Sequence, residues 1–94
     1  MADQKKKDVS AWEQALRRTL KSEHGKGWGL RESRGRAQVV QILEDRTRRS
    51  TKLEINWAGK NARLMLEAVA QIREYLDGGK DWDESVAARA ELTD

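Results

Sequence analysis

The segment covering residues 51–57 constrains the fold of this chain more than any other part of its sequence. Thr, Leu, Ile and Trp occupy its odd positions, and Lys, Glu and Asn occupy its even positions. Such strict alternation is typical of a strand that buries one face and exposes the other. Two shorter segments of strand character precede it, at residues 28–32 and 38–43, and polar turn sequences at 33–35 and 45–48 separate the three. The sequence therefore predicts a three-stranded antiparallel meander.

Helical patterns flank this meander on both sides. Ser10 and Glu13 have the spacing of a capping box, and the helix predicted over residues 10–23 carries an apolar residue at every fourth position. Residues 62–76 carry apolar side chains at helical spacing, after Asn61, a residue type that often precedes a first turn. A lone meander cannot bury a face by itself, so this second helix should cover it. We predict an α+β fold: a three-stranded antiparallel sheet packed against one main helix, with an extra N-terminal helix.

The length of 94 residues suits one domain with one modest core. Residues 1–9 contain a lysine run and no apolar anchor, which predicts a disordered tail. The folded domain is expected to span residues 10–80. Residues 81–94, which open on a group of acidic residues, are expected to form a C-terminal tail or a short helix leading to a following domain.

Few residues in the chain could carry catalysis or bind a metal. Cysteine is absent, and His24, the single histidine, lies beside glycines, where we expect an ordinary solvated side chain. The glycine-rich run at residues 25–29 precedes a strand and lacks the Gly-Lys-Ser/Thr ending of a P-loop. Asp81 and its acidic neighbours lack the full ligand loop of a calcium site and suit helix capping better. We predict no enzyme activity in this chain, and no cofactor, metal or small-molecule substrate.

The sequence contains no run of 18 apolar residues, so we expect no membrane span. The lysines near the start are not followed by an apolar stretch, so we expect no secretory signal. A cytoplasmic location fits both expectations and the absence of cysteine.

Positive charge is concentrated in the middle of the chain. Residues 26–52 hold eight basic and three acidic side chains, a net charge of +5. Residues 61–94 hold four basic and eight acidic side chains, a net charge of −4. This distribution is typical of a surface that binds phosphate groups, although a chance cluster of solvated side chains would give the same count.

The polar face of the predicted sheet is the candidate binding surface. Arginine, lysine, glutamine and asparagine can read base edges and neutralise phosphates in a major groove wide enough for strands. Any half-exposed sheet carries polar residues outside, but the arginines at both hairpin turns favour nucleic acid. Trp28 and Trp57 fall in the apolar phase of their strands and are expected in the core, with Trp12 anchoring its helix and Trp82 folding back on the domain. The candidate DNA-binding residues are Arg31, Arg34, Arg36, Gln41, Arg48, Lys52 and Asn56.

Part of this pattern resembles a known family. Gly27-Trp28-Gly29-Leu30-Arg31, followed by Arg34-Gly35-Arg36 at the start of a second strand, is similar to the first hairpin of the arm-binding N-terminal domains of tyrosine-type phage integrases. The third strand ending at Trp57, the helix over residues 61–76 and the step from Ile72 to Trp82 also fit. The resemblance covers residues 26–84. The more apolar second strand and the helix over residues 10–23 depart from it.

The resemblance implies a sheet that enters the major groove of arm-type DNA sites near the ends of a phage or prophage element. Core-binding and catalytic domains would follow in the same polypeptide, because the catalytic arginines, histidine and tyrosine of a recombinase have no counterparts here. The implied partners are double-stranded DNA, other integrase subunits and accessory DNA-bending proteins, in the nucleoid of a bacterial cytoplasm. Two alternatives stay open: a protein-interaction module that uses its amphipathic helices or strand edges, and an RNA-binding module.

Overall fold

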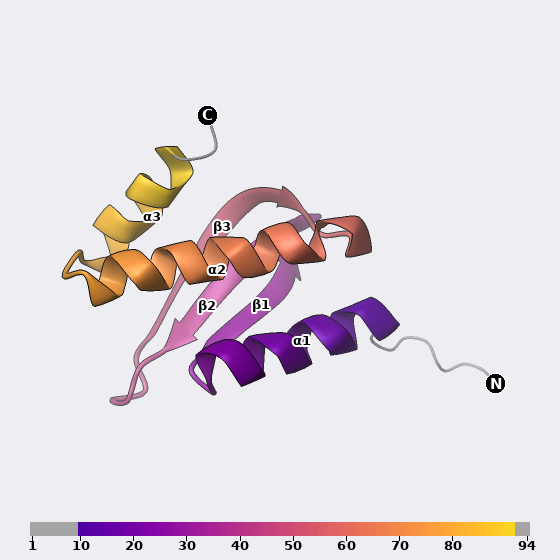
Figure 1. The fold of residues 1–94 in the computed structure, drawn as a ribbon, viewed down its shortest axis with the longest axis horizontal. Coiled ribbons are helices and arrows are strands. Elements are labelled where there is room, and N and C mark those ends of the chain that lie inside the picture. The colour runs from indigo at the N-terminus through magenta and orange to yellow at the C-terminus, as the bar shows by residue number, and fades with distance from the viewer. Residues whose placement is uncertain (1–9, 92–94) are drawn as a thin grey trace.

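The computed structural model describes residues 10–91, and the tail predicted at residues 1–9 lies outside them. Within that range the chain forms an α+β fold of one three-stranded antiparallel sheet and three α-helices (Figure 1). The predicted fold class, meander and flanking helices are confirmed. In chain order the elements are α1 (Ala11–His24), β1 (Trp28–Ser33), β2 (Arg36–Ile42), β3 (Arg48–Asn56), the 3-10 turn η2 (Gly59–Asn61), α2 (Ala62–Asp77) and α3 (Trp82–Glu91).

The strands follow the order β1-β2-β3, and two short turns set their register. In the first turn Arg34 and Gly35 both have positive φ, 53° and 83°, the combination whose twist matches a two-residue hairpin. The Gly35 N–H donates to the Glu32 carboxylate at 2.9 Å. The register places Leu30 opposite Val39 on the neighbouring strand. With this register, the residues that alternate along each strand line up across the strands and form one mainly apolar and one mainly polar face of the sheet.

The pairing between β2 and β3 is irregular near one end. Arg36 lies opposite Asn56, but Gln38 lies opposite Lys52, so the three residues between Lys52 and Asn56 face Ala37 alone. Irregularities of this kind bend the strand that carries the extra residues. Glu54 lies in this bend, and its carboxylate accepts hydrogen bonds from Arg89 of α3, which lower its pKa most, while the charge of Arg36 on β2 also lowers it.

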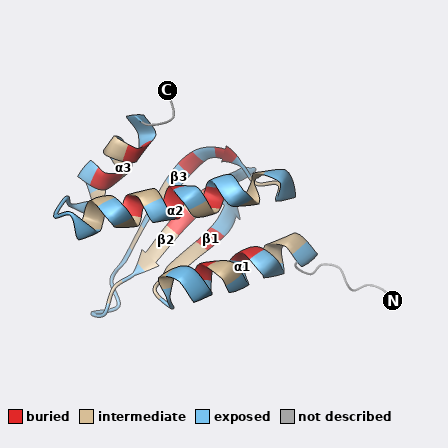
Figure 2. Ribbon diagram, in the orientation of Figure 1, coloured by how far each residue is buried: buried red, intermediate tan, exposed pale blue. Residues whose placement is uncertain are grey.

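All three helices pack against the same side of the sheet. Figure 1 views the molecule from that side, with α2 crossing in front of the strands. Each layer supplies alternate or helically spaced apolar residues, which Figure 2 shows as buried positions on strands and helices. The buried apolar core consists of Leu16, Leu20, Leu30, Ala37, Val39, Leu53, Ile55, Met65, Ala68, Val69 and Ile72.

The start of α1 is fixed to the end of β3. The Glu13 carboxylate accepts from the Ser10 N–H at 3.0 Å, as the capping-box spacing predicts, and from Trp57 Nε1 at 2.6 Å. The Trp57 bond is the largest cause that lowers the pKa of Glu13. The Trp12 ring lies 5.2 Å from that of Trp57, centroid to centroid. A Cβ at Gly59 would lie 3.1 Å from Trp12 Cγ, so this tryptophan packs directly on the chain before α2.

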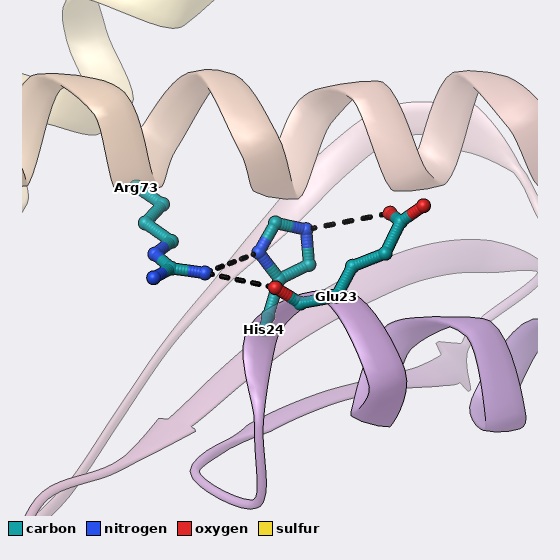
Figure 3. Close-up of polar contacts among 3 residues, drawn as sticks. All are labelled: Glu23, His24 and Arg73. Carbon is teal, nitrogen blue, oxygen red and sulfur yellow. Dashed lines mark hydrogen bonds and ion pairs between the residues drawn. The ribbon is translucent and has the colours of Figure 1, made fainter.

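The end of α1 is fixed to α2 through His24 and Arg73 (Figure 3). Arg73 Nη1 lies 3.0 Å from the Glu23 carbonyl oxygen, to which it donates, and 3.1 Å from His24 Nδ1. A nitrogen that faces a guanidinium must accept, so His24 is neutral with its proton on Nε2. The expectation of a solvated histidine is wrong: the His24 side chain is 7% exposed. Burial first, and then the positive charge of Arg73, lower the pKa of His24.

Helix α3 packs against α2 and closes the other end of the helix layer. Its N-terminus carries a reciprocal cap, because Asp81 Oδ1 accepts from the Glu84 N–H at 2.8 Å and Glu84 Oε1 accepts from the Asp81 N–H at 3.1 Å. Trp82 folds back on the domain as predicted, 6.3 Å from the Trp28 ring. Arg89 is 5% exposed and donates two hydrogen bonds to Glu54, at 3.0 and 2.6 Å.

Candidate nucleic-acid interface

One face of the sheet carries no core residue and faces away from the helices. The core residues of each strand share one parity: Leu30 on β1, Val39 on β2 and Leu53 on β3. Residues of the opposite parity make up what we call the open face. Its members are Gly29, Arg31, Ser33, Arg36, Gln38, Val40, Ile42, Arg48, Ser50, Lys52, Glu54 and Asn56.

A polar ladder crosses all three strands at the centre of the open face. The register places Arg31 opposite Gln38 and Gln38 opposite Lys52. Arg31 Nε donates to Gln38 Oε1 at 2.9 Å, and Gln38 Nε2 donates to Ser50 Oγ at 3.3 Å. Directly opposite residues have Cβ atoms about 5 Å apart, so the ladder presents three polar groups within the span of a few bases. The hydrogen bonds hold Arg31 and Gln38 in one fixed arrangement.

The structure places most predicted site residues on or beside this face. Arg31, Arg36 and Lys52 are exposed there, and Asn56 lies opposite Arg36 at the end of β3. The remaining two predicted arginines lie at the ends of the strands: Arg34 forms the first hairpin turn, and Arg48 begins β3 opposite Ile42.

Gln41 is the exception, and its predicted placement on the polar face needs correction. It lies opposite Trp28 on the covered face, where its Oε1 accepts from Arg49 Nε at 2.8 Å. β2 carries apolar residues on both faces, with Val39 on the covered face and Val40 on the open face. The sequence of the strand alone therefore does not show which face is buried. Gln38 is the residue that sequence reasoning missed. The signal was available, because Gln38 is two residues from Arg36, and residues two apart in a strand face the same way.

Cations around the open face form no ion pair with a described residue, although the charge of Arg36 contributes to lowering the pKa of Glu54, after the hydrogen bond from Arg89. The carboxylates nearest in sequence serve the turns: Glu32 accepts from Gly35, and Asp45 accepts from the Thr47 N–H and hydroxyl at 3.0 and 2.6 Å. The latter two bonds lower the pKa of Asp45. Within residues 10–91, no ion pair involves the following cations of the open face and its turns: Arg31, Arg34, Arg36, Arg46, Arg48 and Lys52.

The open face also offers apolar contact area. Ile42 is 47% exposed, and Val40 is half-buried between Gly29 and Ser50. An aliphatic group beside polar hydrogen-bonding groups can contact the methyl of thymine, while the polar groups contact base edges. The arrangement can therefore combine polar and apolar contacts with one partner.

Among the described residues, no group of three or more His, Asp or Glu side chains is placed to hold a metal ion. No helix in the same part of the chain is long and apolar enough to cross a membrane. Comparisons of the chain with protein-family models, with curated proteins and with solved structures found no match.

Proposed function

We propose that this domain binds double-stranded DNA, with the open face of its sheet in the major groove. The observation that carries the proposal is the Arg31–Gln38–Lys52 ladder, which spans all three strands on a face that no described helix packs against. Arginine pairs with guanine and glutamine with adenine through two hydrogen bonds each, and lysine neutralises phosphate. The hydrogen bond between Arg31 and Gln38 preorganises the two base-reading groups.

The dimensions of the sheet support the same partner. Neighbouring strands lie about 4.8 Å apart, so the two outer strands of three are roughly 10 Å apart. A major groove is about 12 Å wide and admits strands. The cations at the two hairpin turns, among them Arg34 and Arg46, extend the positive charge of the open face to the ends of the strands.

The finer proposal is that this module binds arm-type sites for a phage or prophage integrase. It is supported by the hairpin resemblance, by the meander followed by α2, and by the surplus of basic residues in the sheet. In that role the domain positions a recombinase on the ends of the element, together with other integrase subunits and DNA-bending proteins. Strand exchange would depend on catalytic residues outside this chain.

The packing of the tryptophans favours duplex DNA over single-stranded RNA. Recognition of unpaired bases depends on exposed aromatic rings. Here Trp12 packs on Trp57 and Trp28 packs near Trp82, and all four are partly buried against the core. Stacking on bases would require these pairs to separate.

Fluorescence anisotropy with labelled duplexes tests the proposal. Binding should weaken steeply with salt, because cations that contact phosphates release condensed counterions. Arg31→Ala should lower affinity for the preferred duplex by about 5- to 150-fold, since a good base contact is worth about 1–3 kcal/mol. Arg63→Ala is the matched control, because Arg63 lies on α2 with a side chain that is 90% exposed.

Equal affinity of wild type and Arg31→Ala for every duplex would contradict the role of the open face. Preference for a single strand in direct competition with the duplex would contradict the choice of duplex DNA.

A further inference from the structure

A cationic cleft lies between α1 and the free edge of β1. Its volume is about 310 Å³. Apolar side chains, Leu20 among them, form its walls, and three cations surround it: Arg17, Lys21 and Lys26. All three cations are exposed, and none takes part in an ion pair within the described residues.

The cations gather there because of how α1 ends. Arg17 and Lys21 are four residues apart, so they lie on one side of α1, next to the buried Leu16 and Leu20. Gly25, with φ of 86°, then turns the chain so that Lys26 comes back alongside β1. Gly27 fixes the return: a Cβ there would lie 2.9 Å from the Ile42 carbonyl oxygen. Helix and strand thereby present their cations to one cleft.

The opposite edge of the sheet differs in charge. A larger cleft of about 570 Å³ lies between β3, α2 and α3, and Glu54 and Glu67 are among its lining residues. The one cation in that lining, Arg89, is already paired with Glu54. Only the β1 edge therefore combines an open cleft with cations that the fold leaves unpaired.

We propose that the cleft between α1 and β1 binds the phosphodiester backbone of one DNA strand while the open face lies in the major groove. The inference rests on the proposed function. A sheet about 10 Å across in a groove about 12 Å wide brings each edge next to a phosphate backbone. At the β1 edge the backbone would meet three cations, and at the β3 edge it would meet Glu54 and Glu67. The domain thus binds the two strands unequally, and α1 becomes part of the binding surface.

The salt dependence of duplex binding tests this inference with two variants of equal charge. In the cleft variant Arg17→Gln, Lys21→Gln and Lys26→Gln are combined. In the control variant Arg18→Gln, Arg63→Gln and Lys80→Gln are combined, which removes the same charge from exposed positions outside the cleft lining. Glutamine favours helices about as well as the residues it replaces, and circular dichroism checks that both variants fold.

The slope of log K against log salt is negative and becomes shallower by about 0.9 for each lost phosphate contact, so the slope of the cleft variant should be shallower than that of wild type by about 2–3 units. The control variant should keep the slope of wild type. The cleft variant should weaken binding to preferred and random duplexes by the same factor, because backbone contacts carry no sequence information. A cleft variant that keeps the wild-type slope would overturn the inference.

Arg31→Ala, measured in parallel, separates this inference from the proposed function. If Arg31→Ala weakens binding and the cleft variant does not, the cleft assignment is wrong and the open face stands. If the cleft variant weakens binding and Arg31→Ala does not, the cleft contacts phosphate but the open face does not read the groove. If neither weakens binding, both proposals are wrong.

Discussion

Arginine side chains behave in opposite ways on the two faces of this sheet. On the covered face, Arg49 donates to Gln41 at 2.8 Å, and its guanidinium lies 4.8 Å from the Trp82 ring centroid. At the sheet edge Arg89 is buried in a pair with Glu54. On the open face Arg31 donates to the amide oxygen of Gln38 and forms no ion pair within residues 10–91. The number of arginines in a segment therefore does not identify a binding surface. What identifies it is which arginines the fold leaves exposed: Arg31 is exposed, Arg49 is half-buried beside Trp82, and Arg89 is buried.

The largest expected effect comes from two isoleucines, one in the helix layer and one on the open face. Ile72 is 0% exposed on α2, whereas Ile42 is 47% exposed on β2. Ile72→Ala should lower the free energy of unfolding by about 2–5 kcal/mol, because it removes buried methyl groups and leaves a cavity. Ile42→Ala should change it by less than about 0.5 kcal/mol. Urea denaturation measures both, and equal losses would contradict the assignment of faces.

Two neighbouring arginines of β3, Arg48 on the open face and Arg49 on the covered face, allow the two faces to be compared with side chains of the same charge. Arg49→Ala should cost about 1–2 kcal/mol of stability, since it loses the contact with Trp82 and the hydrogen bond to Gln41. For a domain of this size that lowers the melting temperature by about 4–8 °C per kcal/mol. Arg48→Ala should leave the melting temperature unchanged and weaken duplex binding several-fold. Differential scanning calorimetry measures the melting temperature of both variants, and fluorescence anisotropy measures their duplex binding. A lower melting temperature for Arg48→Ala together with weaker binding only for Arg49→Ala would contradict the assignment of the two faces.

Two glutamines of β2, Gln38 on the open face and Gln41 on the covered face, should differ less strongly in their effect on duplex binding. Gln38→Ala should weaken binding to a preferred duplex by about 1 kcal/mol, roughly fivefold, and reduce the preference over random DNA. Gln41→Ala should leave affinity and preference unchanged, because its side chain faces the helix layer. Competition between two duplexes measures the preference. Loss of preference in Gln41→Ala would show that the face assigned from the strand register is not the one that reads DNA.

What the sequence predicted correctly depends on short-range patterns. Strict alternation of apolar and polar residues predicts which side chains of β3 face the core. The Glu13 cap of α1 involves Ser10, which is only three residues away. Predictions failed where the deciding contact is distant in the chain. His24 was expected in solvent but packs against Arg73, which is 49 residues away.

The same limit applies within the candidate site. Gln41 was assigned to the wrong face because β2 carries apolar residues in both phases, so only pairing with β1 and β3 distinguishes them. Asn61 precedes α2 as predicted, but its side chain donates to the Asn56 carbonyl at 3.0 Å instead of capping the helix. For Gln41 the deciding contact is pairing between strands, whereas for Asn61 it is a bond to the chain five residues earlier.

The smallest expected effect is a dependence of stability on pH that belongs to the helix layer alone. The pKa of His24 is lowered below 6.5 in the folded chain, by burial and then by Arg73. The unfolded chain therefore takes up this proton at a higher pH than the folded chain does. The free energy of unfolding should rise with pH through the window below about 6.5, and stability should be lost as the pH falls through it. Melting temperatures from pH 5 to 8 should rise for wild type.

His24→Gln should flatten that rise, because glutamine does not titrate and can still accept from Arg73. Three groups in the described part of the chain face His24: Arg73 from α2, Glu23 beside it on α1 and the Trp28 ring on β1. The Glu23 carboxylate lies 3.9 Å from His24 Nε2. The pKa values of Glu13 and Glu54 are lowered by their Trp57 and Arg89 hydrogen bonds, so these carboxylates act below this window. An unchanged rise in His24→Gln would contradict the assignment. Arginine and lysine keep their charge across this range, so the cations of the open face should bind DNA equally well while the helix layer weakens, which separates the two regions by pH alone.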